Sequence, residues 1–423
     1  MKIRTDFSVI SIPFGLLVIL MLYSLKVASQ DRLTIQGMVI DKVSNERLPF
    51  ASIALKNLPL STVANLNGEF TFHISPKHRE DTLMISMLGY KQKEILLNVL
   101  TFRQKQRFSL SPSEKVLDGI VIKDSLTANE IIKLAIKRIP VNYPSYPVSM
   151  QAFYRESQSV NGNYVSLVES AITMYNENRF KRNTFSGKTR VRVDELRRSF
   201  SHVHKYNDFW DTENLLLHAL NLNPVPNNSK ALEKGNYQRE PNTTMDGKTV
   251  YVLRDTVMRI GIMRFFVESH SYAVIRITNS YNADNMPKVT WEYDDYDSMV
   301  IHPKHRNLVI SFRKYNERYH LNYLSMDHAH HYVINGENRD VFGIKQDIII
   351  NQINTKNPVK IDRKVKARLN KTLESHQYDF NREFWSSYNM LKETPLEKKL
   401  VEDLEKEVSL QDQFEQQSTK EKQ

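Results

Sequence analysis

Histidines are the side chains whose spacing comes closest to a catalytic arrangement in this sequence. They gather late in the chain, at His302, His305, His320, His328, His330 and His331, with Asp327 beside them. On a strand, His328 and His330 would share a face, and Asp327 would serve as a ligand or orient one. This pattern predicts a divalent metal site made of His302, His305, His328 and His330. The competing interpretation is a set of solvent-facing histidines, because no HExxH or HxxE pair accompanies them.

Basic residues form a second candidate site, between positions 179 and 198. Arg190 and Arg192 are two residues apart, so on a strand they would share a face and could bind a phosphate-bearing lipid or an acidic glycan. A charged, exposed strand that resists edge pairing explains the same residues.

Aromatic residues form a third candidate site, on the strands predicted after position 249. We expect Phe266, Trp291 and Tyr323 to line a groove for a lipid-like or glycan ligand. Ordinary core packing of aromatic strands is the alternative.

Motifs for other chemistries are missing from the sequence. It contains no cysteine, which excludes disulfides and a thiolate nucleophile, and it has no GxSxG, P-loop or GxGxxG pattern. The sequence does not exclude a Ser/His/Asp triad, because such triads assemble from distant residues and are recognised by their geometry. We therefore expect a non-enzymatic protein without a cofactor. A metal-dependent enzyme using the histidines from His302 to His331 is the alternative.

The charge and the N-terminus indicate where the protein works. The net charge of +11 would favour nucleic acid, but the basic residues are interleaved with 48 acids and no nucleic-acid-binding motif is present. Lys2 and Arg4 precede an apolar run, and Val27-Ala28-Ser29 places small residues before Gln30. This pattern predicts a cleaved signal peptide at residues 1–29, with an uncleaved anchor as the alternative. We expect an exported protein, periplasmic or outer-membrane associated, and no nucleic-acid partner.

The elements that position these residues begin with a small β-sandwich at residues 31–111. Short alternating segments follow one another between turn signals, among them Ile35 to Val39, Ala51 to Leu55 and Leu83 to Met87. Asn67-Gly68 is a hairpin dipeptide, because both residues tolerate positive φ.

This segment resembles the carboxypeptidase regulatory-like (prealbumin-like) domain of exported Bacteroidetes-type proteins. The matching residues are Gly37-x-Val39-x-Asp41, Leu48-Pro49-x-Ala51, Asn67-Gly68-x-Phe70 and Asp81-Thr82-Leu83 running to Gly89-Tyr90. The resemblance implies an accessory module that docks to an envelope protein partner, with no peptidase activity of its own.

The rest of the chain predicts a larger α+β domain on a curved antiparallel sheet, so that the whole protein is mainly β with some α. A linker at residues 112–127 precedes a meander domain at residues 128–350, with helices expected at 128–139 and 213–220. Residues 351–423 are expected to form a helical and polar tail, with a helix at 395–408 and a frayed end from Gln411.

The body at residues 128–390 also resembles exported Bacteroidetes-type proteins that carry the same N-terminal domain. The motifs that carry this resemblance are Ala128-Asn-Glu-Ile-Ile132 with Ile139-Pro140 and Asn142-Tyr-Pro144, then Phe153-Tyr-Arg-Glu156, and late in the chain Phe384-Trp385-x-x-Tyr388-Asn389. It implies architecture and location and no established chemistry.

Overall fold

A computed structural model describes residues 32–113, 126–177, 189–200, 215–221, 232–257, 261–293, 299–368, 373, 379–392 and 395–420. These residues form two small sheets, then a large antiparallel sheet with a few helices, which confirms the predicted mainly β fold class. The predicted signal peptide at 1–29 and most of the predicted linker lie outside the described residues. None of the helices in this described part combines the length and hydrophobicity that a membrane span requires.

The N-terminal sandwich consists of a three-stranded sheet, β4-β1-β7, and a four-stranded sheet, β3-β2-β5-β6. The strands are β1 (Leu33–Asp41), β2 (Ser52–Leu55), β3 (Ser61–Val63), β4 (Glu69–Ile74), β5 (Thr82–Ser86), β6 (Lys93–Leu96) and β7 (Lys105–Leu110). Short 3-10 helices lie at Pro76–His78 and Leu97–Val99. Alternate residues of β4 are buried, because one face packs on the opposite sheet. The core, which includes Ile35, Phe70 and Phe108, is drawn entirely from this segment.

The turn at Asn67-Gly68 joins the two small sheets and does not make a hairpin. Gly68 has φ of +69°, and its N–H donates to the Asn65 carbonyl at 2.9 Å. The strands on either side, β3 and β4, belong to different sheets, so the predicted hairpin is wrong although the tight turn forms.

Gly68→Ala is expected to lower the free energy of unfolding by about 1–3 kcal/mol. A Cβ at this position would lie 2.5 Å from the Val39 carbonyl oxygen, in addition to the cost of positive φ. Gly162 is a matched control, because it also has positive φ but nothing lies within 4 Å of its added Cβ. Urea denaturation of both variants should show the larger loss for Gly68→Ala, and equal losses would contradict the crowding at Val39.

The large sheet has eleven antiparallel strands in the order β10-β9-β8-β18-β17-β16-β14-β13-β12-β11, with β15 paired to β16. The strands are β8 (Val148–Val160), β9 (Asn163–Asn176), β10 (Thr189–Phe200), β11 (Tyr237–Met245), β12 (Lys248–Asp255), β13 (Ile262–Glu268), β14 (Val274–Asn282), β15 (Trp291–Tyr293), β16 (Met299–Tyr315), β17 (Arg318–Ile334) and β18 (Glu337–Asn354). The three longest strands, β16, β17 and β18, are consecutive in the chain and neighbours in the sheet.

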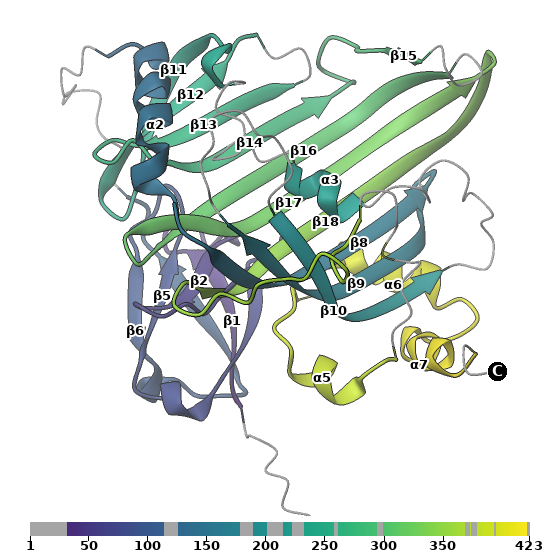
Figure 1. Ribbon diagram of the computed structural model, residues 1–423, viewed down its shortest axis with the longest axis horizontal. Coiled ribbons are helices and arrows are strands. Elements are labelled where there is room, and N and C mark those ends of the chain that lie inside the picture. Colours follow the sequence, from purple (N-terminus) through teal and green to yellow (C-terminus); the bar gives the residue numbers. More distant parts are fainter. Residues whose placement is uncertain are drawn as a thin grey trace, which may run out of the picture.

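Helices cover one face of this sheet, which we call the helix face. α2 (Ala128–Asn142) begins where predicted, with a capping box formed by Thr127 and Glu130, and continues past Pro140. With α3 (Leu215–Asn221) it packs over a row of apolar residues that includes Leu253, Ile310 and Leu324. In Figure 1 both helices lie in front of the large sheet.

The sandwich packs against the opposite face, which we call the sandwich face. The ring of Phe50, from the sandwich, stacks on Tyr323 of β17 with 5.1 Å between centroids. The Ser61 hydroxyl donates to the Ile350 carbonyl at 2.8 Å, and the Arg313 guanidinium donates to the Pro59 carbonyl at 2.7 Å. The two parts of the chain are thus joined by apolar packing and by direct hydrogen bonds.

The C-terminal segment returns to the same face. It contains α5 (Arg382–Ser387), α6 (Pro395–Leu404) and α7 (Leu410–Lys420), drawn in yellow in Figure 1. Leu400, Leu404 and Phe414 form one buried cluster with Leu167 of β9. The predicted frayed end from Gln411 is therefore wrong, because Phe414 anchors a helix there.

Candidate functional site

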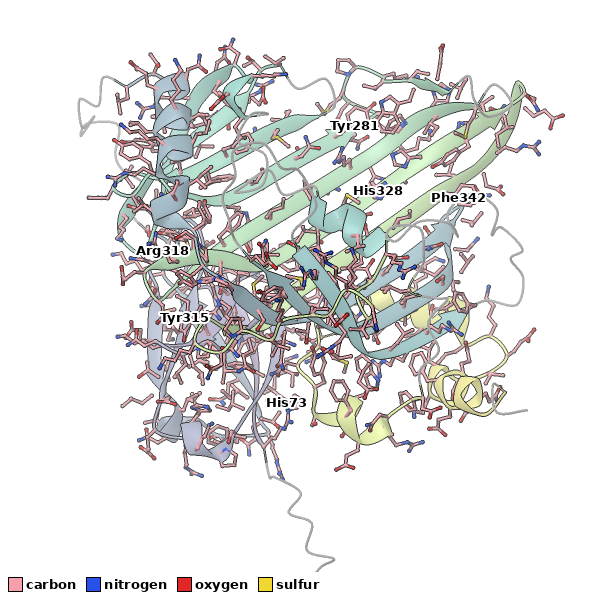
Figure 2. All side chains as sticks on the ribbon, in the orientation of Figure 1. His73, Tyr281, Tyr315, Arg318, His328 and Phe342 are labelled. Atoms are coloured by element: carbon pink, nitrogen blue, oxygen red, sulfur yellow. The ribbon has the colours of Figure 1, made fainter. Side chains whose placement is uncertain are left out.

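A cleft of about 610 Å³ opens where the sandwich, β8 and the C-terminal segment meet. Figure 2 labels His73 at this boundary. The lining side chains include four cations and one carboxylate: Arg47, Asn67, Glu69, Thr71, His73, Arg155, Tyr388, Met390, Leu391, Lys392 and Lys398. Its walls therefore come from three segments that are far apart in the sequence.

The floor of the cleft rests on a buried charge network. Arg155 Nε donates to Glu169 Oε1 at 2.6 Å, and Arg197 Nε donates to Glu169 Oε2 at 2.6 Å. Arg155 is 6% exposed and Glu169 2%, so both charges are removed from water. Burial acts to raise the pKa of Glu169, but the two guanidinium groups outweigh it and lower that pKa. Arg155 also donates to the Leu391 carbonyl at 3.2 Å, which fixes the C-terminal segment.

Two of the motifs that carry the resemblance of the body meet beside this network. Tyr388 donates to the Ala152 carbonyl at 2.9 Å, and its ring lies 6.4 Å from that of Phe153. The guanidinium of Arg197 lies over the Trp385 ring, 4.6 Å from its centroid. Residues 153–156 and 384–389 therefore form one structural unit, which holds the wall of the cleft in place.

Asn389 ties this wall to the sandwich. Its side-chain oxygen accepts from the His73 N–H at 2.7 Å, and its side-chain nitrogen donates to the His73 carbonyl at 3.0 Å. Burial, helped by the nearby charge of Arg32, lowers the pKa of His73, so this ring is neutral near pH 7.

The rim of the cleft is cationic. Lys392 pairs with Glu69 at 3.1 Å, and Lys105 pairs with the other oxygen of the same carboxylate. Arg47 and Lys398 line the cleft without an anionic partner among the described residues. Two cations are therefore free to interact with a bound anion.

The four predicted metal ligands do not form one site. His328 and His330 lie on the helix face, with 3.3 Å between their Nδ1 atoms. His302 stacks on His331 on the other face, where His305 contacts Asp327 at 3.0 Å. The sheet thus separates the predicted ligands into two pairs. Within the described residues, no group of three or more His, Cys, Asp or Glu side chains is placed to hold a metal ion.

The predicted aromatic groove is wrong, because its three residues lie on different faces. Tyr323 is 1% exposed, stacks on Phe50 and donates to Asp347 at 2.7 Å. Phe266 shares the sandwich face and packs near Leu88. Trp291 lies on the helix face, with its ring 5.4 Å from that of His330. The sandwich covers the face on which the sequence predicted an accessible groove.

The predicted basic pair, Arg190 and Arg192, is occupied by the protein's own groups. Arg190 pairs with Glu177 at 3.2 Å and donates to the Ile361 carbonyl, and Arg192 pairs with Asp194 at 2.6 Å. Both lie outside the residues that line the cleft.

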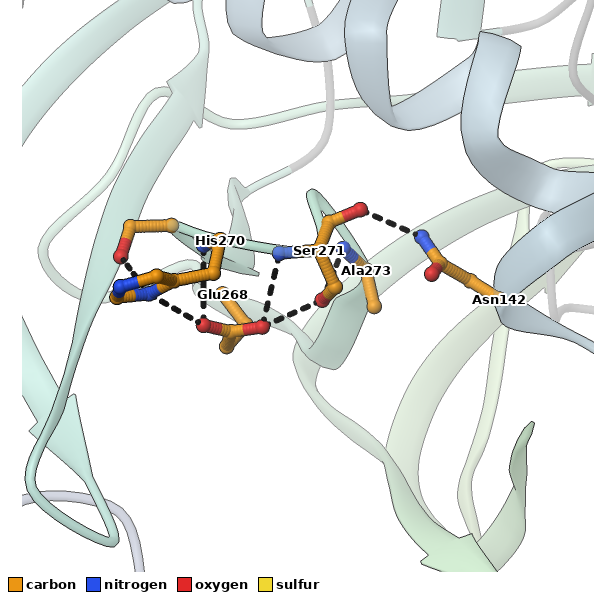
Figure 3. Close-up of polar contacts among 6 residues, drawn as sticks. Asn142, Glu268, His270, Ser271 and Ala273 are labelled. Atoms are coloured by element: carbon orange, nitrogen blue, oxygen red, sulfur yellow. Dashed lines mark hydrogen bonds and ion pairs between the residues drawn. The ribbon is translucent and has the colours of Figure 1, made fainter. Parts of the chain in front are cut away.

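A serine, a histidine and a carboxylate also meet at the β13–β14 turn (Figure 3), but their connections differ from those of a catalytic triad. Ser271 Oγ donates to Glu268 Oε2 at 2.5 Å, and His270 Nδ1 contacts Glu268 Oε1 at 3.1 Å. In a triad the serine would donate to the histidine, which acts as the base. Here both Ser271 and His270 contact the Glu268 carboxylate. Asn142 of α2 donates to the Ser271 carbonyl at 2.9 Å. The arrangement caps a turn and anchors α2.

Comparison with known proteins identifies the N-terminal part. Residues 35–122 match the family described as CarboxypepD_reg-like domain. The recognition of this domain from its residues is confirmed, and its assignment to the exported Bacteroidetes type stays a prediction. No curated protein shows a significant match to this sequence.

Solved structures similar to this chain cover just over half of it at low identity. An outer membrane lipoprotein-sorting protein domain from Vibrio parahaemolyticus is 10% identical, covering 55% of this chain and 95% of its own, with a TM-score of 0.24. A LolA superfamily protein from Nitrosomonas europaea is 11% identical, covering 57% of this chain and 98% of its own, with a TM-score of 0.23. At TM-scores this low, the similarity carries no functional argument.

Proposed function

We propose that this chain is a non-enzymatic, exported accessory protein of the cell envelope that binds an anionic ligand in the cleft between its two domains. The observation that carries the proposal is the placement of Arg47 and Lys398 in a cleft of about 610 Å³ without anionic partners among the described residues. Export rests on the basic start, apolar run and small residues of positions 1–29.

The geometry supports binding more than catalysis. The floor is rigid, because Glu169 holds two arginines and Leu391 is tied to one of them. A fixed floor lowers the entropic cost of binding, and Arg47 and Lys398 supply the positive charge that attracts an anion. Phosphate-bearing lipids, acidic glycans and acidic peptides all carry the negative charge that the cleft would recognise. The proposed ligand is therefore an anion of one of these classes.

The double charge reversal Arg47→Glu with Lys398→Glu is expected to weaken anion binding at least ~10-fold, because repulsion replaces attraction in a partly enclosed site. Both side chains are exposed, so the fold should survive. The probes are phosphatidylglycerol vesicles, a polygalacturonate oligomer and a short aspartate-rich peptide, each titrated against wild type and variant.

The matched control is Arg363→Glu with Lys366→Glu, which changes the net charge equally at exposed positions away from the cleft. Binding of at least one probe should fall with the cleft variant and persist with the control. Equal losses in both variants, or none in the cleft variant for any probe, would overturn the proposed function.

A further inference from the structure

We infer that the ligand of the cleft is an extended acidic peptide, one residue of which pairs with the main chain of Thr71 on β4. This inference rests on the proposed function and names the class of its ligand.

β4 is the edge strand of its sheet. In the described structure it pairs with β1 on one side, and the other side faces the cleft. The Val39 N–H of β1 donates to the Gly68 carbonyl, which shows that the main chain of Gly68 points toward β1. By the register of the two strands, the main-chain groups of Phe70 and Phe72 also point toward β1. Glu69, Thr71 and His73 therefore direct their N–H and C=O groups away from β1.

The outward groups on both sides of Thr71 are already occupied. The Glu69 N–H donates to the Asn65 side chain at 2.9 Å, and the Glu69 carbonyl accepts from the Asn65 N–H at 2.8 Å. The His73 main chain exchanges two hydrogen bonds with the side-chain amide of Asn389. At His73 both partner groups belong to one side-chain amide, whereas at Glu69 the acceptor is the side chain of Asn65 and the donor is its main-chain N–H.

Thr71 lies between these two positions and lines the cleft. Its outward N–H and C=O have no hydrogen-bond partner among the described residues. An edge strand with an open donor and acceptor is the geometry that binds an added peptide strand. A peptide residue supplies both complementary groups at strand spacing, as Asn65 and Asn389 do for the neighbours of Thr71.

The flanking occupied positions limit the pairing to a short stretch. Because Asn65 and Asn389 block the edge on either side, a longer strand cannot continue the ladder, and the peptide must leave the edge after the paired residue. The free cations of the cleft, Arg47 and Lys398, then favour acidic side chains near that residue. The site thus combines main-chain recognition with selection for negative charge.

The test compares two peptides of identical charge with the full-length protein. One is a seven-residue peptide of alternating aspartate and valine, and the other carries an N-methyl group on the central residue, which removes its donor. The unmodified peptide should bind at least 10-fold more tightly.

The protein variants are Thr71→Pro, which removes the outward N–H at an edge position where proline is tolerated, and Thr71→Val, which keeps it. Thr71→Pro should weaken binding to a similar degree, and Thr71→Val should bind as wild type.

The outcomes separate this inference from the proposed function. If both peptides bind equally and Arg47→Glu with Lys398→Glu abolishes both, anion binding stands and the pairing with Thr71 is overturned. If vesicles or polygalacturonate bind in a cleft-dependent way and neither peptide does, the ligand is a lipid or glycan and the peptide inference fails. If Thr71→Pro does not fold, the comparison of the two peptides on wild-type protein still decides the question.

Discussion

Glu169→Ala is expected to lower the free energy of unfolding by about 3–5 kcal/mol, because it leaves two arginines without their carboxylate in a buried site. Arg155 and Arg197 both donate to Glu169, and Arg155 is 6% exposed. Without the carboxylate, the positive charges face each other and the buried Phe153 and Trp385 rings. Urea denaturation monitored by tryptophan fluorescence measures the loss.

The matched control is Glu177→Ala, which removes the carboxylate of a partly exposed pair with Arg190. Such pairs contribute about 0–1 kcal/mol, since water and salt screen them. A loss of 1 kcal/mol or less for Glu169→Ala would show that the network beneath the cleft is not a structural requirement.

Acid is expected to destabilise the protein between pH 7 and pH 5 through buried, neutral histidines. Burial is the main cause that lowers the pKa of His328 to about 3, and that of His320 and of His330 to about 4. In the unfolded chain these groups titrate near pH 6.5, so between pH 6.5 and 4 the unfolded state binds more protons than the folded state. Stability is therefore complete above about pH 6.5 and falls with pH. At pH 5 the loss is about 2 kcal/mol for each histidine.

Denaturation of wild type and His328→Gln at pH 7 and pH 5 checks this expectation. The variant should lose about 2 kcal/mol less than wild type over this interval, because glutamine takes up no proton. His270→Gln is the control, since the side chain of His270 is 78% exposed. A pH dependence that is the same in wild type and His328→Gln would contradict the buried neutral state of His328.

The sequence predicted helices and strands well where local signals mark their position. The helix expected at 128–139 begins at Ala128 as predicted, and the strand expected from Ile35 to Val39 lies within β1. These signals act over a few residues, so they need no knowledge of the rest of the fold. The full extent of β17, Arg318–Ile334, was harder to predict, because no local signal marks where so long a strand begins and ends.

The buried network beneath the cleft depended on a register that the sequence conceals. Counting back from Asn161-Gly162 as a two-residue turn places Arg155 opposite Val168. A bulge between Gln158 and Ser159 moves the register by one, so Arg155 faces Glu169. Without that bulge, two opposite charges would lie on different faces of the sheet. The bulge has no clear sequence signal, which is why the network was missed.

The prediction of an aromatic groove was wrong for a different reason. Phe266 and Tyr323 do lie on strands as expected, but which face the sandwich covers depends on contacts such as that between Phe50 and Tyr323, 273 positions apart in the sequence. Docking between domains leaves no periodic pattern in either of them. The same holds for the cleft, whose walls come from residues near positions 70, 155 and 390.

The link between His73 and Asn389 has a consequence for how the protein is made. The two residues are 316 positions apart, and a chain is synthesised from its N-terminus. The sandwich can complete its core long before Asn389 emerges, and until then the edge of β4 is open at His73 as well as at Thr71. An open edge is a template for association with other chains, so the nascent protein passes through a stage in which it needs protection from self-association. When Asn389 binds His73, it closes one of these two open positions, and the same step completes the cleft wall formed by residues 388–392.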